Sequence, residues 1–328
     1  MRYRQRGVLE SILFDPDMEL YRFYPDLDKL LTECTREAEN SMRMLSQFSM
    51  KAKFSVFPPI EFGSFGSNNW SIVPIGKKFV EIRLVLDAFD QVDCEYVFAL
   101  RSKILMDSLS VWTNCAFYQT GIESGVPHVD DLCRNIFFDQ IDWLEDHPIM
   151  SGKLCLSTDQ LSYGNSIVAG SIGQGERLAR AAQLFHEARI MLLSAPHLHN
   201  DTAAALLISA LEVVSLIDEP PKNCASCGQP IYKISRRVAD LGVRHLGAGA
   251  KWIFDRHYKR RSSYLHRGVP HAAQPYTGSA IPQLDPQGIE GCALPTPVGA
   301  PMNLMEFTSC IIRAEMRSEV AARSLAAP

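Results

Sequence analysis

The sequence lacks an apolar run long enough to cross a membrane. A spanning helix needs about 20 apolar residues in succession, whereas the best candidate, residues 203–217, is shorter and contains Glu212. The cations Arg2, Arg4 and Arg6 precede an apolar segment that is too short for a secretory signal peptide. We therefore expect a cytoplasmic protein that has no membrane-bound part.

Two motifs of common enzyme classes are also missing. The Gly-rich stretch 164–175 has neither the Lys-Ser/Thr end of a phosphate-binding loop nor the dinucleotide pattern, and it is predicted to be a linker. The pair His186-Glu187 is not a zinc-protease motif, because Ile190 stands where the second histidine is required. The nine cysteines are an odd, scattered set, which is typical of reduced, buried thiols.

One Cys-x-x-Cys pair, Cys224 and Cys227, is present, and no second pair accompanies it. Two thiolates fill two corners of a zinc tetrahedron, and a structural site needs four ligands. The obvious distant suppliers are Cys292 and His271 in a Pro-rich stretch. A redox role is disfavoured because no strand pattern precedes the pair. A structural zinc site and free thiols both remain open.

Hydrophobic periodicity divides the chain into two parts. In residues 1–172, apolar spacings of three and four indicate helices, and alternation indicates strands. Asp90 and Asp93 are candidate caps for the second helix. These patterns predict helices over 27–48 and 90–114 and strands over 53–60, 70–75 and 79–86. We expect a mixed α/β N-terminal domain of unknown function over 1–172.

From Glu176 onward the pattern is helical almost to the end of the chain. The exception is residues 269–301, which hold seven prolines and little periodicity. Such a long insertion is predicted to cover a site or to dock a protein partner. The helical patterns lie over 176–195, 200–217, 231–241, 251–265 and 304–324. The predicted fold class is α+β, with an all-α domain of about five helices over 173–328.

A basic segment lies within a weakly acidic protein. Residues 231–268 contain ten Lys or Arg against two acids, a local charge of about +8. The whole chain has a formal charge of −4, so the remainder is near −12. The segment is either a surface for a polyanion or a solvated helical face.

Two residues in this segment suggest chemistry. Arg261 is a permanent cation, and His266 gains and loses a proton near neutral pH. Cleavage of a phosphodiester without a metal needs this combination. Glu212 lies in an apolar helix, where a carboxylate is costly unless a cation faces it. Arg261 or a neighbour is the candidate cation, and the alternative is that Glu212 lies on the exposed edge of its helix.

Residues 176–324 resemble the HEPN superfamily of compact α-helical domains, and more closely its Apea-like branch. The resemblance rests on 204–217 with Ala-Leu-Glu at 210–212, on 231–241, and on Arg-Ser-Ser-Tyr-Leu-His-Arg-Gly at 261–268. The last stretch matches the family's Arg-x4-6-His signature through Arg261 and His266. The resemblance implies a HEPN-like helical bundle and metal-independent RNA cleavage by a homodimer.

The resemblance also implies roles for single residues. His266 transfers protons at the ribose 2′-hydroxyl or the leaving oxygen, and Arg261 stabilises the phosphorane, which gives a 2′,3′-cyclic phosphate. Arg260 is the alternative arginine within the allowed spacing. Ser262 stands where many active members have a more polar or amide residue, and Tyr264 either packs or stacks on a base. An ideal helix places positions five apart at about 140°, so Arg261 and His266 share a face only if the last turn loosens.

The surrounding cations Arg237, Arg256, Lys259 and Arg267 are expected to hold RNA phosphates. Catalysis of this kind requires no cofactor. The biological setting that the resemblance implies is a defence (antiviral) or toxin-like effector. The alternative function is a catalytically inactive module that binds RNA or a protein. A third is a zinc-containing interaction domain whose loop 269–301 docks a protein.

Overall fold

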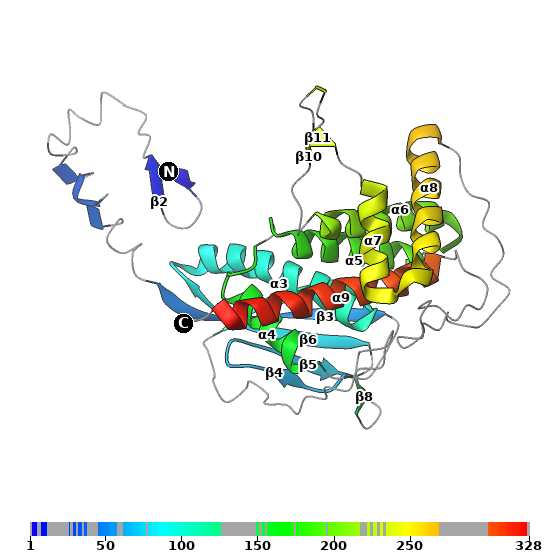
Figure 1. Cartoon of the computed structure of the whole chain (residues 1–328). Coiled ribbons are helices and arrows are strands. Elements are labelled where there is room, and N and C mark those ends of the chain that lie inside the picture. The colour runs from blue at the N-terminus through cyan, green and yellow to red at the C-terminus, as the bar shows by residue number, and fades with distance from the viewer. Residues whose placement is uncertain are drawn as a thin grey trace.

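An antiparallel sheet lies against one side of a stack of helices, and the fold class is therefore α+β (Figure 1). The computed structural model describes most of the chain between residue 45 and residue 326. The described residues are 45–57, 62–76, 78–125, 149–150, 153–154, 156–173, 175–194, 196–216, 222–223, 226–227, 230–231, 234–268 and 301–326, with 2–4, 8–11, 26, 29–30, 32–34 and 36–37 nearer the N-terminus.

The elements have the following bounds in chain order. The strands are β1 Arg2–Arg4, β2 Val8–Ser11, β3 Ser46–Phe57, β4 Phe65–Gly66, β5 Trp70–Ile75, β6 Phe79–Ala88, β7 Ala116–Gly125, β8 Ile149–Met150, β9 Lys153–Leu154, β10 Lys222–Asn223 and β11 Pro230–Ile231. The helices are α3 Gln91–Thr113, α4 Thr158–Val168, α5 Arg177–Ser194, α6 Pro196–Ser215, α7 Ile234–Leu246, the 3-10 helix η2 Ala248–Ala250, α8 Lys251–Arg267 and α9 Pro301–Ala326.

The main sheet has the strand order β4-β5-β6-β3-β7, and every neighbouring pair is antiparallel. Residues of β6 alternate between buried and half-buried over most of its length, which confirms the strand predicted over 79–86. Val80, Ile82, Leu84 and Leu86 form its buried face. Helix α3 packs against β3, β6 and β7.

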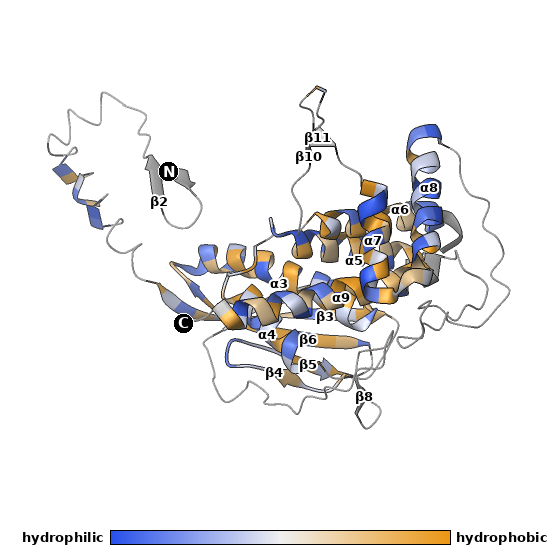
Figure 2. Cartoon of the chain, viewed as in Figure 1, coloured by the Kyte–Doolittle hydropathy of each residue, from blue (hydrophilic) through white to orange (hydrophobic). Residues whose placement is uncertain are grey.

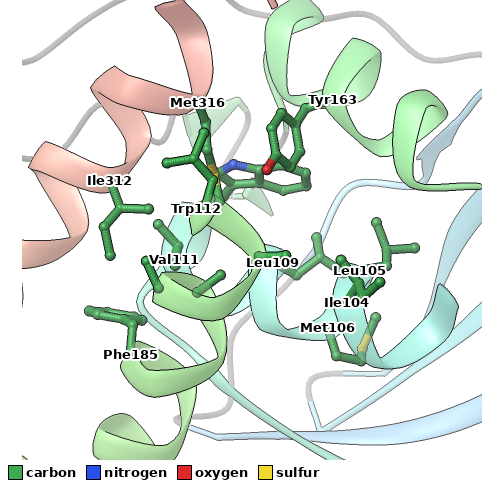
Figure 3. Packing of buried hydrophobic residues seen from close by; sticks show 14 of the residues in the cluster. Ile104, Leu105, Met106, Leu109, Val111, Trp112, Tyr163, Phe185, Ile312 and Met316 are labelled. Carbon is green, nitrogen blue, oxygen red and sulfur yellow. The ribbon is translucent and has the colours of Figure 1, made fainter. Parts of the chain in front are cut away.

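Helix α3 lies at the centre of the molecule. It begins at the N-cap Asp90, whose carboxylate accepts a hydrogen bond from the N–H of Asp93 at 2.7 Å, and it ends at Asn114 with φ 54°. The predicted boundaries are confirmed. Its second half has no single buried stripe, because residues 104–113 are buried on all sides between the sheet, α5 and α9 (Figure 3).

A buried histidine joins α3, α5 and β7. The Nδ1 atom of His186 lies 2.8 Å from a carboxylate oxygen of Asp107, and the backbone N–H of Phe117 donates to Nε2 at 3.0 Å. Because Nε2 accepts, Nδ1 holds the proton and donates to Asp107. Lys103 pairs with the second carboxylate oxygen at 2.9 Å. Both ring nitrogens are therefore used in holding the structure together.

The helix predicted over 27–48 is wrong at its C-terminal end. Phe48 lies in β3, and Leu30, within the predicted range, is 57% exposed. Strand β3 pairs with β6 on one side and with β7 on the other. Hydrogen bonds along both edges of a central strand outweigh a local helical spacing of apolar residues.

The predicted linker over 164–175 begins too early, because Gly164 lies inside α4. A Cβ atom at this position would lie 2.2 Å from the Trp70 ring, so the close packing of α4 on β5 requires glycine. The chain leaves α4 at Ala169 and enters α5 at Arg177. The link is therefore confined to residues 169–176.

Five α-helices, α5–α9, lie in the described residues after Glu176, in agreement with the number expected. Helix α6 begins at Pro196, upstream of residue 200, where the predicted helix begins, because proline fits the first position of a helix. Gly242 of α7 meets Phe254 of α8, where a Cβ atom would lie 2.3 Å from the ring. The division at residue 172 stays a prediction, and buried residues on both sides of it form one continuous cluster.

Candidate functional site

Helix α8 has an inner and an outer face. Ile253, Phe254 and His257 are buried on the inner face, where Phe254 packs against Phe307 of α9 with ring centroids 6.3 Å apart. The outer face is polar, as the blue and white ribbon of α8 shows beside the more apolar α5 and α6 (Figure 2). The C-terminal end of α8 points away from the sheet (Figure 1).

Arg261 is held by helix α6. Its Nη1 atom lies 2.7 Å from Glu212 Oε1, and Nη2 donates to the hydroxyl of Ser209 at 3.2 Å. The Arg261 and Glu212 side chains are only 18% and 15% exposed. The Arg261 guanidinium carbon also lies 5.9 Å from the centre of the Tyr258 ring. The cation expected opposite Glu212 is therefore present, and the exposed-edge alternative is wrong.

Burial dominates the electrostatics of this pair. It raises the pKa of Glu212, although Arg261 and a hydrogen bond with Tyr258 act in the opposite direction. Burial also raises the pKa of Tyr258, and the negative charge of Glu212 adds to the effect. Burial therefore disfavours the charged form of Glu212 more than Arg261 and Tyr258 favour it. Its structural effect is to orient the Arg261 side chain.

His266 lies on the last turn of α8 and is exposed. The helix stays regular to its end, since the N–H of Gly268 donates to the carbonyl of Tyr264 at 3.0 Å and Gly268 takes φ 61° as the C-cap. Positions five apart then lie about 140° apart around the axis. Arg261 and His266 therefore do not share a face within one chain.

The outer face of α8 contains a hollow of about 440 Å³. Spacings of four, three, four and three place Trp252, Arg256, Lys259 and Ser263 on the same side of the helix as His266. Trp252 is 41% exposed. The hollow is lined by Trp252, Asp255, Arg256, Lys259, Arg260 and Ser263. It was not predicted as a unit, although the helical spacing in the sequence contains the signal.

Two other residues of the predicted site contact α6. The hydroxyl of Tyr264 lies 3.0 Å from that of Thr202, so Tyr264 packs in this structure. Arg260 is half-buried, and its pKa is lowered by burial and by Arg256, while Asp201 acts in the opposite direction. Arg260 therefore lies between the outer hollow and α6.

The remaining predicted residues are spread more widely. Ser262 is half-buried on α8, Arg267 is exposed at its end, and Arg237 is half-buried on α7. Cys227 is exposed in a turn between the paired strands β10 and β11. Cys224, Cys292 and most of the 269–301 insertion lie outside the described residues. Within the described part of the chain, no group of three or more His, Cys, Asp or Glu residues is arranged to hold a metal ion. Structural zinc stays a prediction.

The chain matches no protein-family model, no curated protein sequence and no solved structure. In the parts of the chain that the structure describes, no helix has the length and apolar character needed to span a membrane.

Proposed function

We propose that this chain binds RNA and cleaves it without a metal ion, as a homodimer of HEPN-like helical bundles formed by α5–α9. The observation that carries the proposal is the exposed His266 at the end of a basic helical face. An imidazole beside cations that bind phosphate is the minimum needed to move protons at a phosphodiester. Arg261, held by Glu212, supplies the fixed positive charge.

The proposed reaction has two proton transfers. His266 removes the proton of a ribose 2′-hydroxyl, and the 2′-oxygen forms a bond to the adjacent phosphorus. Arg261 stabilises the negative charge of the phosphorane. The bond from phosphorus to the 5′-oxygen then breaks, and a second imidazole gives that oxygen its proton. The products are a 2′,3′-cyclic phosphate and a 5′-hydroxyl.

The need for two protons and the helix geometry both favour a dimer. One imidazole does not serve as base and acid at the same moment, so the second comes from the His266 of another copy. Arg261 and His266 point about 140° apart on one regular helix. A second copy can therefore bring its His266 to the phosphate that Arg261 of the first copy contacts.

Cleavage of end-labelled RNA in the presence of EDTA tests this function. We expect the wild-type chain to give 2′,3′-cyclic phosphate ends, and His266→Ala to lower the rate by about 10²–10⁴-fold. The matched control is Leu265→Ala, which changes a neighbouring residue that is 51% exposed. Cleavage that EDTA abolishes, or that persists in His266→Ala, would contradict the proposal.

The second candidate function is RNA binding without cleavage. The observation that favours it is that Arg261 Nη1 and Nη2 each donate a hydrogen bond within the chain, to Glu212 and Ser209, with which a phosphate must compete. In that case the wild-type chain and His266→Ala bind RNA equally and neither gives product. Binding weakens steeply as salt concentration rises, since cations on the outer face of α8 release counterions from RNA.

A further inference from the structure

A second hollow, of about 300 Å³, lies on another part of the molecule, where four segments of the chain meet. The segments are α4, the link 169–176, the first turn of α5 and the last turns of α9. Ligand pockets in proteins begin at about this volume. The polar and charged residues that line it are Tyr163, Glu176, Arg177, Glu319 and Arg323, with Ile172 and Leu178 as apolar wall.

Tyr163 supplies a buried donor to this hollow. The residue is 1% exposed, and its ring packs edge-on against Trp112 with centroids 5.9 Å apart (Figure 3). Its hydroxyl lies within reach of the charges of Glu319, Arg323 and Glu176, which line the same hollow. Burial raises the pKa of Tyr163, Glu319 and Glu176 add to the rise, and Arg323 acts in the opposite direction. The hydroxyl therefore keeps its proton, and a buried hydroxyl of this kind normally donates to an acceptor.

The start of α5 supplies further donors. The first N–H groups of an α-helix have no partner within the helix, and they form the positive end of its dipole. Helix α5 runs from Arg177 to Ser194, so its first turn faces the hollow through Arg177 and Leu178. Arg177 is exposed and adds a guanidinium to this end of the hollow.

Two carboxylates balance these donors. Glu319 accepts from Arg323 Nε at 2.7 Å, and Arg323 Nη1 also donates to the carbonyl of Ser171 at 3.2 Å. Arg323 thereby ties α9 to the link and fixes Glu319 near Tyr163. Glu176 is exposed at the start of α5. The charges of the two arginines and two glutamates cancel, so a ligand of a single charge would face repulsion at one side.

We propose that this hollow binds a small zwitterion of the free amino acid class. The ligand carboxylate accepts from the Tyr163 hydroxyl and from the first turn of α5. The ligand ammonium lies toward Glu176 and Glu319, and the apolar wall of Ile172 and Leu178 accommodates an aliphatic side chain. The site is separate from the outer face of α8 and does not depend on RNA cleavage.

Calorimetric titration of the full chain with L-leucine tests the site. We expect saturable binding of one L-leucine per chain, and much weaker binding of acetate, methylammonium or inorganic phosphate, each of which carries only one sign of charge. Tyr163→Phe keeps the ring against Trp112 and removes only the hydroxyl. This change should weaken L-leucine binding by about tenfold to a hundredfold, the effect of losing a hydrogen bond to a charged group.

Two further variants separate the site from general effects. Tyr118→Phe removes a hydroxyl from an exposed tyrosine on β7 and should leave L-leucine binding unchanged. Glu176→Gln should weaken L-leucine binding but should not weaken acetate binding, because the change removes a charge that repels acetate. The proposal is overturned if L-leucine gives no saturable heat up to about 10 mM, which is ten times a weak dissociation constant of about 1 mM. It is also overturned if acetate or phosphate binds as tightly, or if Tyr163→Phe binds L-leucine like the wild type.

Discussion

The two faces of α8 place similar polar residues in opposite environments. On the inner side, Arg261 is paired with Glu212 across the interface with α6, and little of either side chain is exposed. On the outer side, Lys259 and His266 are exposed on a face that contains a hollow. Polar groups on the inner side are used in stabilising the fold, whereas those on the outer side are available to a ligand.

Under the proposed function, this difference bears on which arginine or lysine contacts RNA first. A basic run in the sequence makes all of its cations look equivalent, yet only some face solvent. Arg261 is bonded through two of its nitrogen atoms within the chain, whereas Lys259 lies on the same side as His266. We infer that Lys259 attracts the phosphate backbone and that Arg261 acts only once a phosphate reaches it.

The largest expected effect belongs to the inner apolar anchor. Phe254→Ala removes a ring that is 1% exposed and that packs on Gly242 and Phe307. The free energy of unfolding should fall by about 3–5 kcal/mol, as is usual when a buried Phe is truncated to Ala. Trp252→Ala, on the outer face, should change it by less than about 1 kcal/mol. Urea unfolding measures the free energy of unfolding of both variants. Equal losses of stability would show that the inner and outer faces of α8 contribute equally to the fold.

The next effect concerns the buried charge. Arg261→Ala should destabilise the protein by about 2–4 kcal/mol, because it leaves the Glu212 carboxylate largely buried without its cation. Adding Glu212→Gln removes that charge and should restore most of the loss. The comparison needs urea unfolding of the wild type, both single variants and the double variant at pH 7. A double variant that is no more stable than Arg261→Ala would mean that Arg261 stabilises by packing alone.

The third effect is smaller and depends on pH. Since the pKa of Glu212 is raised in the folded protein, folding favours its neutral form over its charged form. The wild type should therefore gain stability relative to Glu212→Gln as the pH falls through the raised pKa of Glu212 in the folded protein. This gain should be complete below 4.5, the ordinary pKa of a glutamate. At pH 7 the variant should lie within about 1 kcal/mol of the wild type. Thermal unfolding across this range measures the difference, and a relative loss on acidification would have the wrong sign.

The smallest effect should appear on the outer face. Lys259→Ala removes one of the cations proposed to bind phosphate, so the slope of log affinity against log salt for single-stranded RNA should become shallower by about 0.7. Stability should not change. Arg236→Ala is the matched control, because Arg236 is an exposed α7 cation that pairs with Asp240 at 3.5 Å. An equal change of slope in both variants would show that RNA does not prefer the outer face of α8 to the exposed surface of α7.

Local signals predicted the elements that have strong caps. Asp90 and Asn114 bound α3 as expected, and Gly268 ends α8. The signals failed where distant segments compete with local spacing. Phe48 continues a helical pattern of apolar residues but lies in β3, because that strand pairs on both edges. The sequence pattern places Gly164 in a linker, whereas in the structure Gly164 packs against the Trp70 ring.

The candidate site was predictable in part. A carboxylate within an apolar helix requires a cation, and this argument found Arg261 for Glu212 across 49 residues. It did not find Ser209 or Tyr258, which complete the surroundings of Arg261. The motif did not predict Trp252, because the motif lies at the end of α8, whereas the hollow extends along the helix from Trp252 to Ser263.

The sequence by itself determined the α+β class, the ends of α3 and α8, and the presence of an arginine and a histidine five positions apart. These depend on capping, hydrophobic spacing and charge, which act between neighbours along the chain. Only the tertiary structure decided that Arg261 faces α6, that His266 lies with Lys259 on the opposite side, and that Tyr163 lines a hollow. Burial decided these directions, because the surfaces that exclude water from each side chain come from distant parts of the chain.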